Sequence, residues 1–184
     1  TFDIFTPLRK SKRSSTDGLK INTMKKIIKA ILLVLLVALV MIQLFPIDKT
    51  NPVSDPATSF GAIENPPGEV AEMLHGACFD CHSYETTYPW YTNVQPVGWW
   101  IRGHYRHARQ ELNLSEWTQY SQEDRKHYLE EMAEEIEEGH MPLKSYTWMH
   151  ADARLTQEEQ QQLTGWLKQQ AAIPPPNYPT PNAG

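Results

Sequence analysis

A continuous apolar segment divides this chain into two unequal parts. Residues 30–42 carry only apolar side chains, and within residues 27–47 only Lys29 and Gln43 are clearly polar. A helix over those 21 residues would be about 30 Å long, which matches the hydrocarbon core of a bilayer. We therefore predict a transmembrane anchor over residues 24–47.

The flanks of this segment predict its orientation. Lys25, Lys26 and Lys29 precede the apolar residues, which predicts a cytoplasmic N-terminus and an exported C-terminal part. A cleaved signal peptide is the alternative, although no A-x-A-like site follows. Either interpretation exports the rest of the chain. Residues 1–23 have no clear periodicity, and we predict a disordered extension there.

Prolines mark the borders of the exported part. Most of the fourteen prolines lie in residues 46–67 and 174–181, which predicts a proline-rich linker over residues 48–67 and a proline-rich disordered tail over residues 173–184. Residues 68–172 remain, enough for one small domain with one core.

Charge is distributed unevenly between the two parts. Eight lysines and arginines stand against two acidic residues up to Ile47, so the remainder of a chain with total charge −5 carries −11. An acidic domain argues against nucleic acid as a partner. It favours a partner protein with a basic docking surface.

Helical patterns dominate the predicted domain. Apolar residues recur at helical spacing over residues 97–112, Ser121 and Gly139 have the residue types that begin and end helices, and Thr156–Glu159 forms a capping box. A further helix is expected from about Glu69 to the cysteines. No alternating strand pattern competes, so we predict an all-α fold.

The only two cysteines lie in the motif CFDCH, residues 78–82. A thioredoxin-type dithiol would need a strand before its helix, and a structural zinc site would need further ligands. A disulfide would close a tight loop and leave His82 unexplained. Covalent c-type haem attachment uses all three side chains, with Cys78 and Cys81 as thioethers and His82 as an iron ligand. We therefore predict one covalent haem c.

The sequence around the motif supports this interpretation. The segments "GACFDCHSYETTYPWYTNVQPVGWWI", "LNLSEW" and "EGHMPLKSYTWMHADARLTQEEQQQLTGW" resemble the bacterial membrane-anchored haem-binding domain family. The resemblance covers residues 64–170. It implies a small helical domain similar to monohaem cytochromes c, built around the haem, and a need for haem-attachment machinery.

The second iron ligand has several candidates. Met141 follows Gly139 and precedes Pro142, in a loop that resembles the distal ligand segment of cytochromes c. We predict Met141 as the distal ligand, with His140 and His150 as alternatives and an open site as a further one.

Other residues near the motif are expected to contact the haem. A carbonyl usually fixes the iron-bound imidazole, and a proline often supplies it in cytochromes c. We expect Pro96 to do so here, with Pro89 as the alternative. Tyr91, Trp99 and Trp100 are predicted as pocket walls, and Arg102 as a partner of the haem propionates.

These features together predict an electron carrier rather than an enzyme. Two axial ligands leave no place for a substrate. The expected location is the bacterial inner membrane, single-pass, with the haem domain in the periplasm beside a membrane or periplasmic redox protein. The alternative is a haem sensor or peroxidase-like enzyme with a displaceable sixth ligand.

Overall fold

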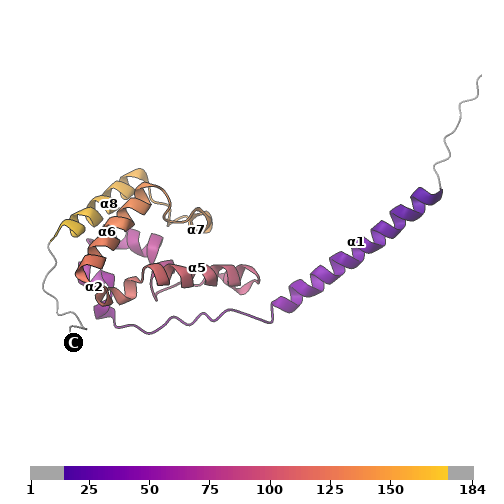
Figure 1. Cartoon of the computed structure of the whole chain (residues 1–184), viewed down its shortest axis with the longest axis horizontal. Coiled ribbons are helices and arrows are strands. Elements are labelled where there is room, and N and C mark those ends of the chain that lie inside the picture. Colours follow the sequence, from indigo (N-terminus) through magenta and orange to yellow (C-terminus); the bar gives the residue numbers. More distant parts are fainter. Residues whose placement is uncertain (1–14, 174–184) are drawn as a thin grey trace, which may run out of the picture. The chain divides into compact units, whose positions relative to one another are not determined.

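The computed structural model describes residues 15–173, with side chains from residue 20 onward. The chain divides into two compact units, one up to Phe45 and one from Pro46. Between residues 15 and 173 every regular element is helical, as predicted (Figure 1). Residues 1–14 of the predicted N-terminal extension and residues 174–184 of the predicted tail lie outside the described residues.

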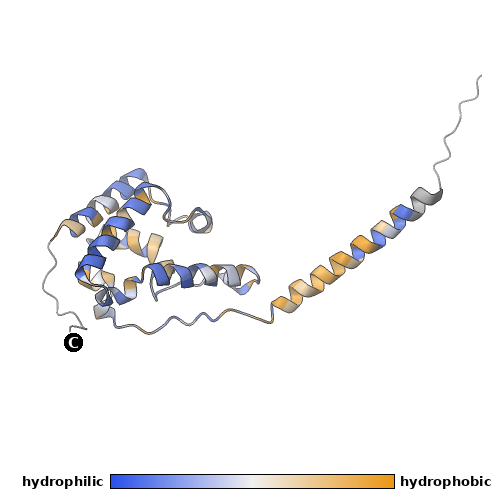
Figure 2. Cartoon of the chain, in the orientation of Figure 1, coloured by the Kyte–Doolittle hydropathy of each residue, from blue (hydrophilic) through white to orange (hydrophobic). Residues whose placement is uncertain are grey.

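The first unit contains one long helix, α1 (Ser15–Ile42). This helix includes residues that we assigned to a disordered extension. Hydrophobic residues fill its second half, whereas its first half carries several lysines (Figure 2). None of the helices within residues 15–173 combines the length and the hydrophobicity that a membrane-spanning segment requires.

The predicted anchor over residues 24–47 is therefore not confirmed. The helix stops at Ile42, and its unbroken apolar part begins only after Lys29. Ile47, at the end of the predicted anchor, belongs to the second unit, where it is buried.

The second unit is organised around two long helices that pack side by side, α6 (Gln122–Glu137) and α8 (Gln157–Ala172) (Figure 1). Both begin where the sequence predicted. Ser121 accepts a hydrogen bond from the Asp124 amide, and Thr156 and Glu159 form the capping box. Gly139 ends the α6 region with a φ of +72°, a conformation that favours glycine. The buried core comprises Phe60, Val70, Leu74, Leu114, Trp117, Leu129, Ala133, Ile136, Leu163, Leu167 and Ala171.

Part of the predicted linker belongs to this core. Two short helices, η1 (Pro56–Thr58) and α2 (Phe60–Glu64), lie within residues 48–67. Phe60 is fully buried, with its ring centroid 4.9 Å from that of Trp117. Glu64 accepts a 2.6 Å hydrogen bond from the Trp117 indole. The composition of this segment is typical of a linker, but its one aromatic residue, Phe60, packs against Trp117 and Trp166 from later parts of the chain.

The remaining elements surround the cysteine motif. α3 (Gly68–Leu74), η2 (His75–Phe79) and α4 (Asp80–His82) follow one another without a break. η3 (Trp90–Asn93) leads into α5 (Val97–Glu111), which packs against α4. η4 (Leu114–Gln119) then connects to α6. α7 (Lys144–Met149) follows α6 and precedes α8 in the sequence. The sequence did not predict α7.

Candidate functional site

The cysteine motif lies in an irregular part of a helix. The five residues of η2 form a π-helical turn that ends directly before Asp80. Such turns are uncommon and occur frequently at functional sites. Cys78 and Cys81 are both free thiols, one inside this turn and one after it. The structure thus has no disulfide between these two residues.

Both thiols are held in a low-polarity environment. Burial is the main cause that raises the pKa of Cys78 and the pKa of Cys81 to about 12. The thiol is therefore the stable form at neutral pH, and thiolate nucleophilicity is suppressed. This environment does not suit a reactive redox dithiol.

His82 has the hydrogen bond that a metal-binding imidazole needs. Its Nδ1 lies 3.1 Å from the backbone carbonyl oxygen of Leu112. A carbonyl can only accept, so Nδ1 carries the proton and Nε2 keeps the lone pair that can bind a metal. Burial lowers the pKa of His82, with an opposing effect from nearby carbonyls. The ring is therefore neutral at pH 7, the form that ligates iron.

The acceptor is Leu112 rather than Pro96, which corrects our prediction. The Pro96 carbonyl accepts the Trp100 amide in the first turn of α5. Leu112 follows α5 and has extended backbone angles, so its carbonyl lies outside the helical hydrogen-bond ladder. The carbonyl beyond the helix end is thus the one that is available to the imidazole.

A cavity of about 440 Å³ brings the main predicted ligands together. We call it the histidine cavity. Its lining includes Cys78, His82 and Met141, which come from the motif and from the loop after α6. The other lining residues are Ala77, Glu111, Leu112, Leu114, His127, Tyr128, Glu131, Met132, Glu135 and Ile136. Its volume lies in the range of cofactor and small-molecule sites.

A second cavity, of about 320 Å³, borders the other cysteine. We call it the tryptophan cavity. It includes Cys81 together with Tyr91 and Trp100, two of the predicted pocket walls. The remaining lining residues are Val97, Ile101, His104, Tyr105, Leu143, Ser145, Tyr146, Trp148 and Met149. The motif therefore lies between two cavities, one at each cysteine.

The two alternative histidine ligands line neither cavity. His150 Nε2 lies 2.6 Å from the Tyr91 hydroxyl, and its ring stacks on Tyr146 at 4.1 Å. His140 Nδ1 lies 3.5 Å from Glu135 and 3.3 Å from Glu138, and its side chain is largely exposed. Each ring therefore has its own partners within the protein.

Trp99, Arg102 and Pro96 also line neither cavity. Trp99 and Arg102 are exposed on α5. The charge of Arg102 contributes to the lowered pKa of Asp48, after the hydrogen bonds that Asp48 accepts from Thr50. Arg102 thus has an acidic neighbour within the protein, and its predicted role toward the haem propionates stays a prediction.

The sequence analysis missed the hydrogen bonds that hold the motif. The Asp80 carboxylate accepts from the Tyr146 hydroxyl at 2.8 Å and from the Thr87 amide at 2.7 Å. The Thr86 hydroxyl donates to the Asp80 carbonyl at 2.6 Å and accepts from Arg109 at 2.6 Å. α4 is thus tied to α5 and α7 on both sides. The only sequence signal was the position of Asp80 inside the motif and of Tyr146 in "MPLKSY".

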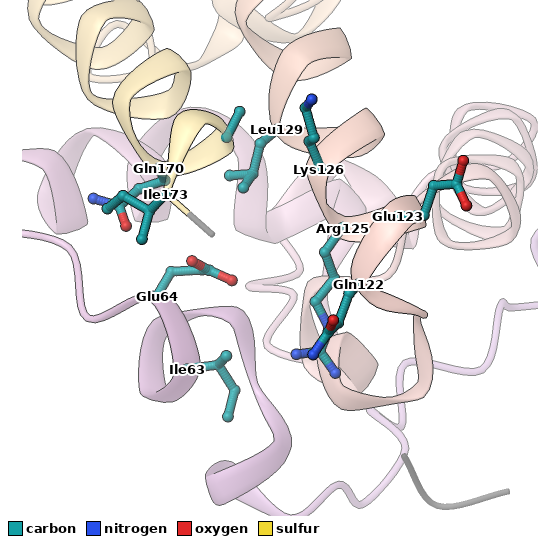
Figure 3. Close-up of a pocket in the computed structure, with 10 residues that line it drawn as sticks. Ile63, Glu64, Gln122, Glu123, Arg125, Lys126, Leu129, Gln170 and Ile173 are labelled. Atoms are coloured by element: carbon teal, nitrogen blue, oxygen red, sulfur yellow. The ribbon is translucent and has the colours of Figure 1, made fainter. Parts of the chain in front are cut away.

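A third cavity, of about 430 Å³, lies between α2, α6 and α8. Figure 3 shows the Glu64 carboxylate pointing into it, with Ile63 and Ile173 nearby. It contains no residue of the cysteine motif. Across the described residues, no group of three or more His, Cys, Asp and Glu side chains is placed to hold a metal ion.

The geometry defines an all-helical domain with a cofactor-sized cavity, whose lining includes the neutral imidazole of His82 and the thioethers of Met132 and Met141. The family comparison gives a consistent result, because the family described as haem-binding domain matches residues 37–169. The chain belongs to the haem-binding domain family, and its cofactor is haem. No curated protein matches the chain, and no solved structure does so.

Proposed function

We propose that this protein binds one haem covalently through Cys78 and Cys81 and carries single electrons. The observation that supports the proposal best is that His82 and Met141 line one cavity together with Cys78. Haem held there would supply reversible one-electron chemistry at its iron. The residues would hold the group, fix its ligands and exclude water.

His82 is the proposed proximal ligand. The Leu112 carbonyl fixes its tautomer and restricts its rotation. The neighbouring hydrogen bonds of Asp80 hold α4 itself, so they are expected to keep the imidazole in place.

Met141 is the proposed distal ligand, and Met132 is its main competitor in the same cavity. Met132 lies on α6 and packs against the hydrophobic core, which restricts its movement. Met141 lies in the loop after Gly139, outside any helix. Loop placement favours Met141, because the thioether can reach the iron without unpacking α6.

Two filled axial positions favour electron transfer over catalysis. A displaceable sixth ligand would instead indicate a haem sensor or a peroxidase-like enzyme. Carbon monoxide binding to the ferrous protein distinguishes an electron carrier from a sensor or enzyme. Rapid binding without denaturation requires an open or labile sixth site.

The acidic rim of the histidine cavity supports a basic redox partner. Glu111, Glu131 and Glu135 line this cavity, so the negative charge of the domain is present where electrons would leave. We also propose that the domain is exported and acquires its haem from attachment machinery there. The exposed apolar side chains of α1 are proposed to hold the chain at the membrane.

Acid–acetone extraction tests the covalent attachment. The full chain is produced with a haem-attachment system, alongside Cys78→Ala with Cys81→Ala and a Met149→Ala control. Wild type and control should keep haem colour in the protein after extraction, and the double variant should lose it. Clean extraction from the wild type would refute covalent attachment while leaving non-covalent haem binding intact. A C-terminal reporter that is active only outside the cytoplasm tests export.

A further inference from the structure

Two side chains of opposite charge lie beside the cysteine motif. Asp80 is inside the motif, between Cys78 and Cys81. Arg109 lies in the last turn of α5, the helix that packs against α4. Both side chains are partly buried. The motif therefore has one acidic and one basic neighbour that belong to the protein itself.

The Asp80 carboxylate has a fixed position. One of its oxygens accepts a 2.8 Å hydrogen bond from the Tyr146 hydroxyl, and the other accepts a 2.7 Å hydrogen bond from the Thr87 amide. Burial and the hydrogen bond to Asp80 raise the pKa of Tyr146 far above its ordinary value, so Tyr146 remains a donor. The negative charge is thus held next to Cys81 from two sides.

The Arg109 guanidinium is fixed as well. It donates a 2.6 Å hydrogen bond to the hydroxyl of the buried Thr86, and it lies 5.2 Å from the centre of the Tyr84 ring. Thr86 donates in turn to the backbone carbonyl of Asp80. Arg109 Nε is buried, and within residues 20–173 it has no hydrogen-bond partner. A buried donor without a partner destabilises the fold, which indicates that the charge of Arg109 serves more than stability.

Both charges act on the motif. Burial raises the pKa of Cys81, the Asp80 carboxylate raises it further, and the Arg109 guanidinium opposes this rise. The same charges would act on any other group there that changes its own charge. Oxidation of a haem iron adds one positive charge. A nearby anion therefore stabilises the oxidised form, and a nearby cation destabilises it.

We propose that Asp80 and Arg109 tune the reduction potential of the haem in opposite directions. The inference rests on the proposed attachment of haem at Cys78 and Cys81. Asp80 lowers the potential, because its negative charge favours the oxidised iron. Arg109 raises the potential, because its positive charge favours the reduced iron. Both side chains are partly buried, so solvent and salt screen them less than they screen surface charges.

A redox titration of the full, haem-loaded chain tests the proposal. Asp80→Asn should raise the potential, and Arg109→Gln should lower it. Two unit charges about 10 Å apart at an effective dielectric constant of about 20 change an equilibrium by roughly tenfold. Each variant should therefore change the equilibrium constant for electron exchange with a reference mediator by on the order of tenfold. The variant that carries both changes should lie between the two single variants.

Conservative and distant variants separate charge from packing. Asp80→Glu and Arg109→Lys keep the charges and should change the equilibrium constant by less than roughly threefold. Lys126→Gln and Glu130→Gln each remove one charge from a pair on α6 whose side chains are 61% and 55% exposed. Exposed charges of this kind contribute little, so these controls should change it by less than about twofold.

The signs of the shifts decide the outcome. Shifts of the same sign in Asp80→Asn and Arg109→Gln, or unchanged potentials in both, would overturn the proposal. Equally large shifts in the charge-keeping variants would overturn it too, because they would indicate altered packing. If thermal melts show that one neutral variant does not fold, the sign of the shift in the other decides. Haem that is extracted from the wild type by acid–acetone would instead refute the attachment on which the proposal rests.

Discussion

Phe60→Ala should destabilise the domain strongly, although Phe60 lies in a segment with the composition of a linker. The side chain is fully buried, and its ring is 4.9 Å from Trp117 and 6.0 Å from Trp166. Removal of a buried phenylalanine costs about 3–5 kcal/mol, including the aromatic contacts. A small domain has only about 5–15 kcal/mol of stability in total.

Urea denaturation followed by circular dichroism measures this loss. With a slope of about 2 kcal/mol per molar urea, a loss of 4 kcal/mol lowers the midpoint by about 2 M. Val53→Ala is the matched control, because Val53 lies in the same segment and is 100% exposed. A Phe60→Ala midpoint within about 0.3 M of the control would show that residues 56–64 do not belong to the core.

Three further predictions concern Gly98, Glu159 and the acidic rim of the histidine cavity. Gly98→Ala should destabilise the domain by about 1–3 kcal/mol, because the new Cβ would collide with the Thr92 carbonyl oxygen. Gly103→Ala, on the same helix with open space around it, should not destabilise the domain, and thermal melts compare the two variants. Hydrogen bonds from Thr156 lower the pKa of Glu159 below its ordinary 4.5. The ionised Glu159 therefore stabilises the folded state at neutral pH, and this stabilisation is lost as the pH falls below about 4.5. Glu159→Gln should remove this part of the acid sensitivity, as denaturation curves from about pH 7 to 3 can measure. Electron exchange with a basic redox protein should slow as salt rises, and exchange with an acidic one should accelerate, in stopped-flow measurements; equal, salt-independent rates would show that the acidic rim does not guide the partner.

The long helices were predictable from sequence because their signals are local. Ser121 and Thr156 carry side chains that bond their own helix, so the caps can be read without knowledge of the fold. α2 and α7 have five and six residues, far below the length at which a helix is stable alone. Their formation depends on tertiary packing, such as that of Phe60 and Tyr146.

The site was predictable only in part for a similar reason. The spacing in the motif predicted Cys78, Cys81 and His82 as haem-binding residues, and the loop between Gly139 and Pro142 predicted Met141. Of these residues, Cys78, His82 and Met141 line the histidine cavity, and Cys81 lines the tryptophan cavity. The carbonyl that fixes His82 could not be identified, because any backbone carbonyl has the same chemistry. Leu112 supplies this carbonyl thirty residues after His82. Its carbonyl is available because α5 ends just before it, and this position depends on the fold.

The visible spectrum and reduction potential of Met141→Ala test the central claim most directly. Met132→Ala is the matched control, because it removes the other thioether of the same cavity. The Met141 variant should keep its covalent haem, lose the six-coordinate low-spin spectrum, show a lower potential and bind carbon monoxide rapidly. The Met132, His140→Ala and His150→Ala variants should retain the wild-type spectrum. An unchanged spectrum and potential in Met141→Ala would contradict ligation by His82 and Met141. Loss of the low-spin spectrum with a lowered potential in Met132→Ala would contradict it as well.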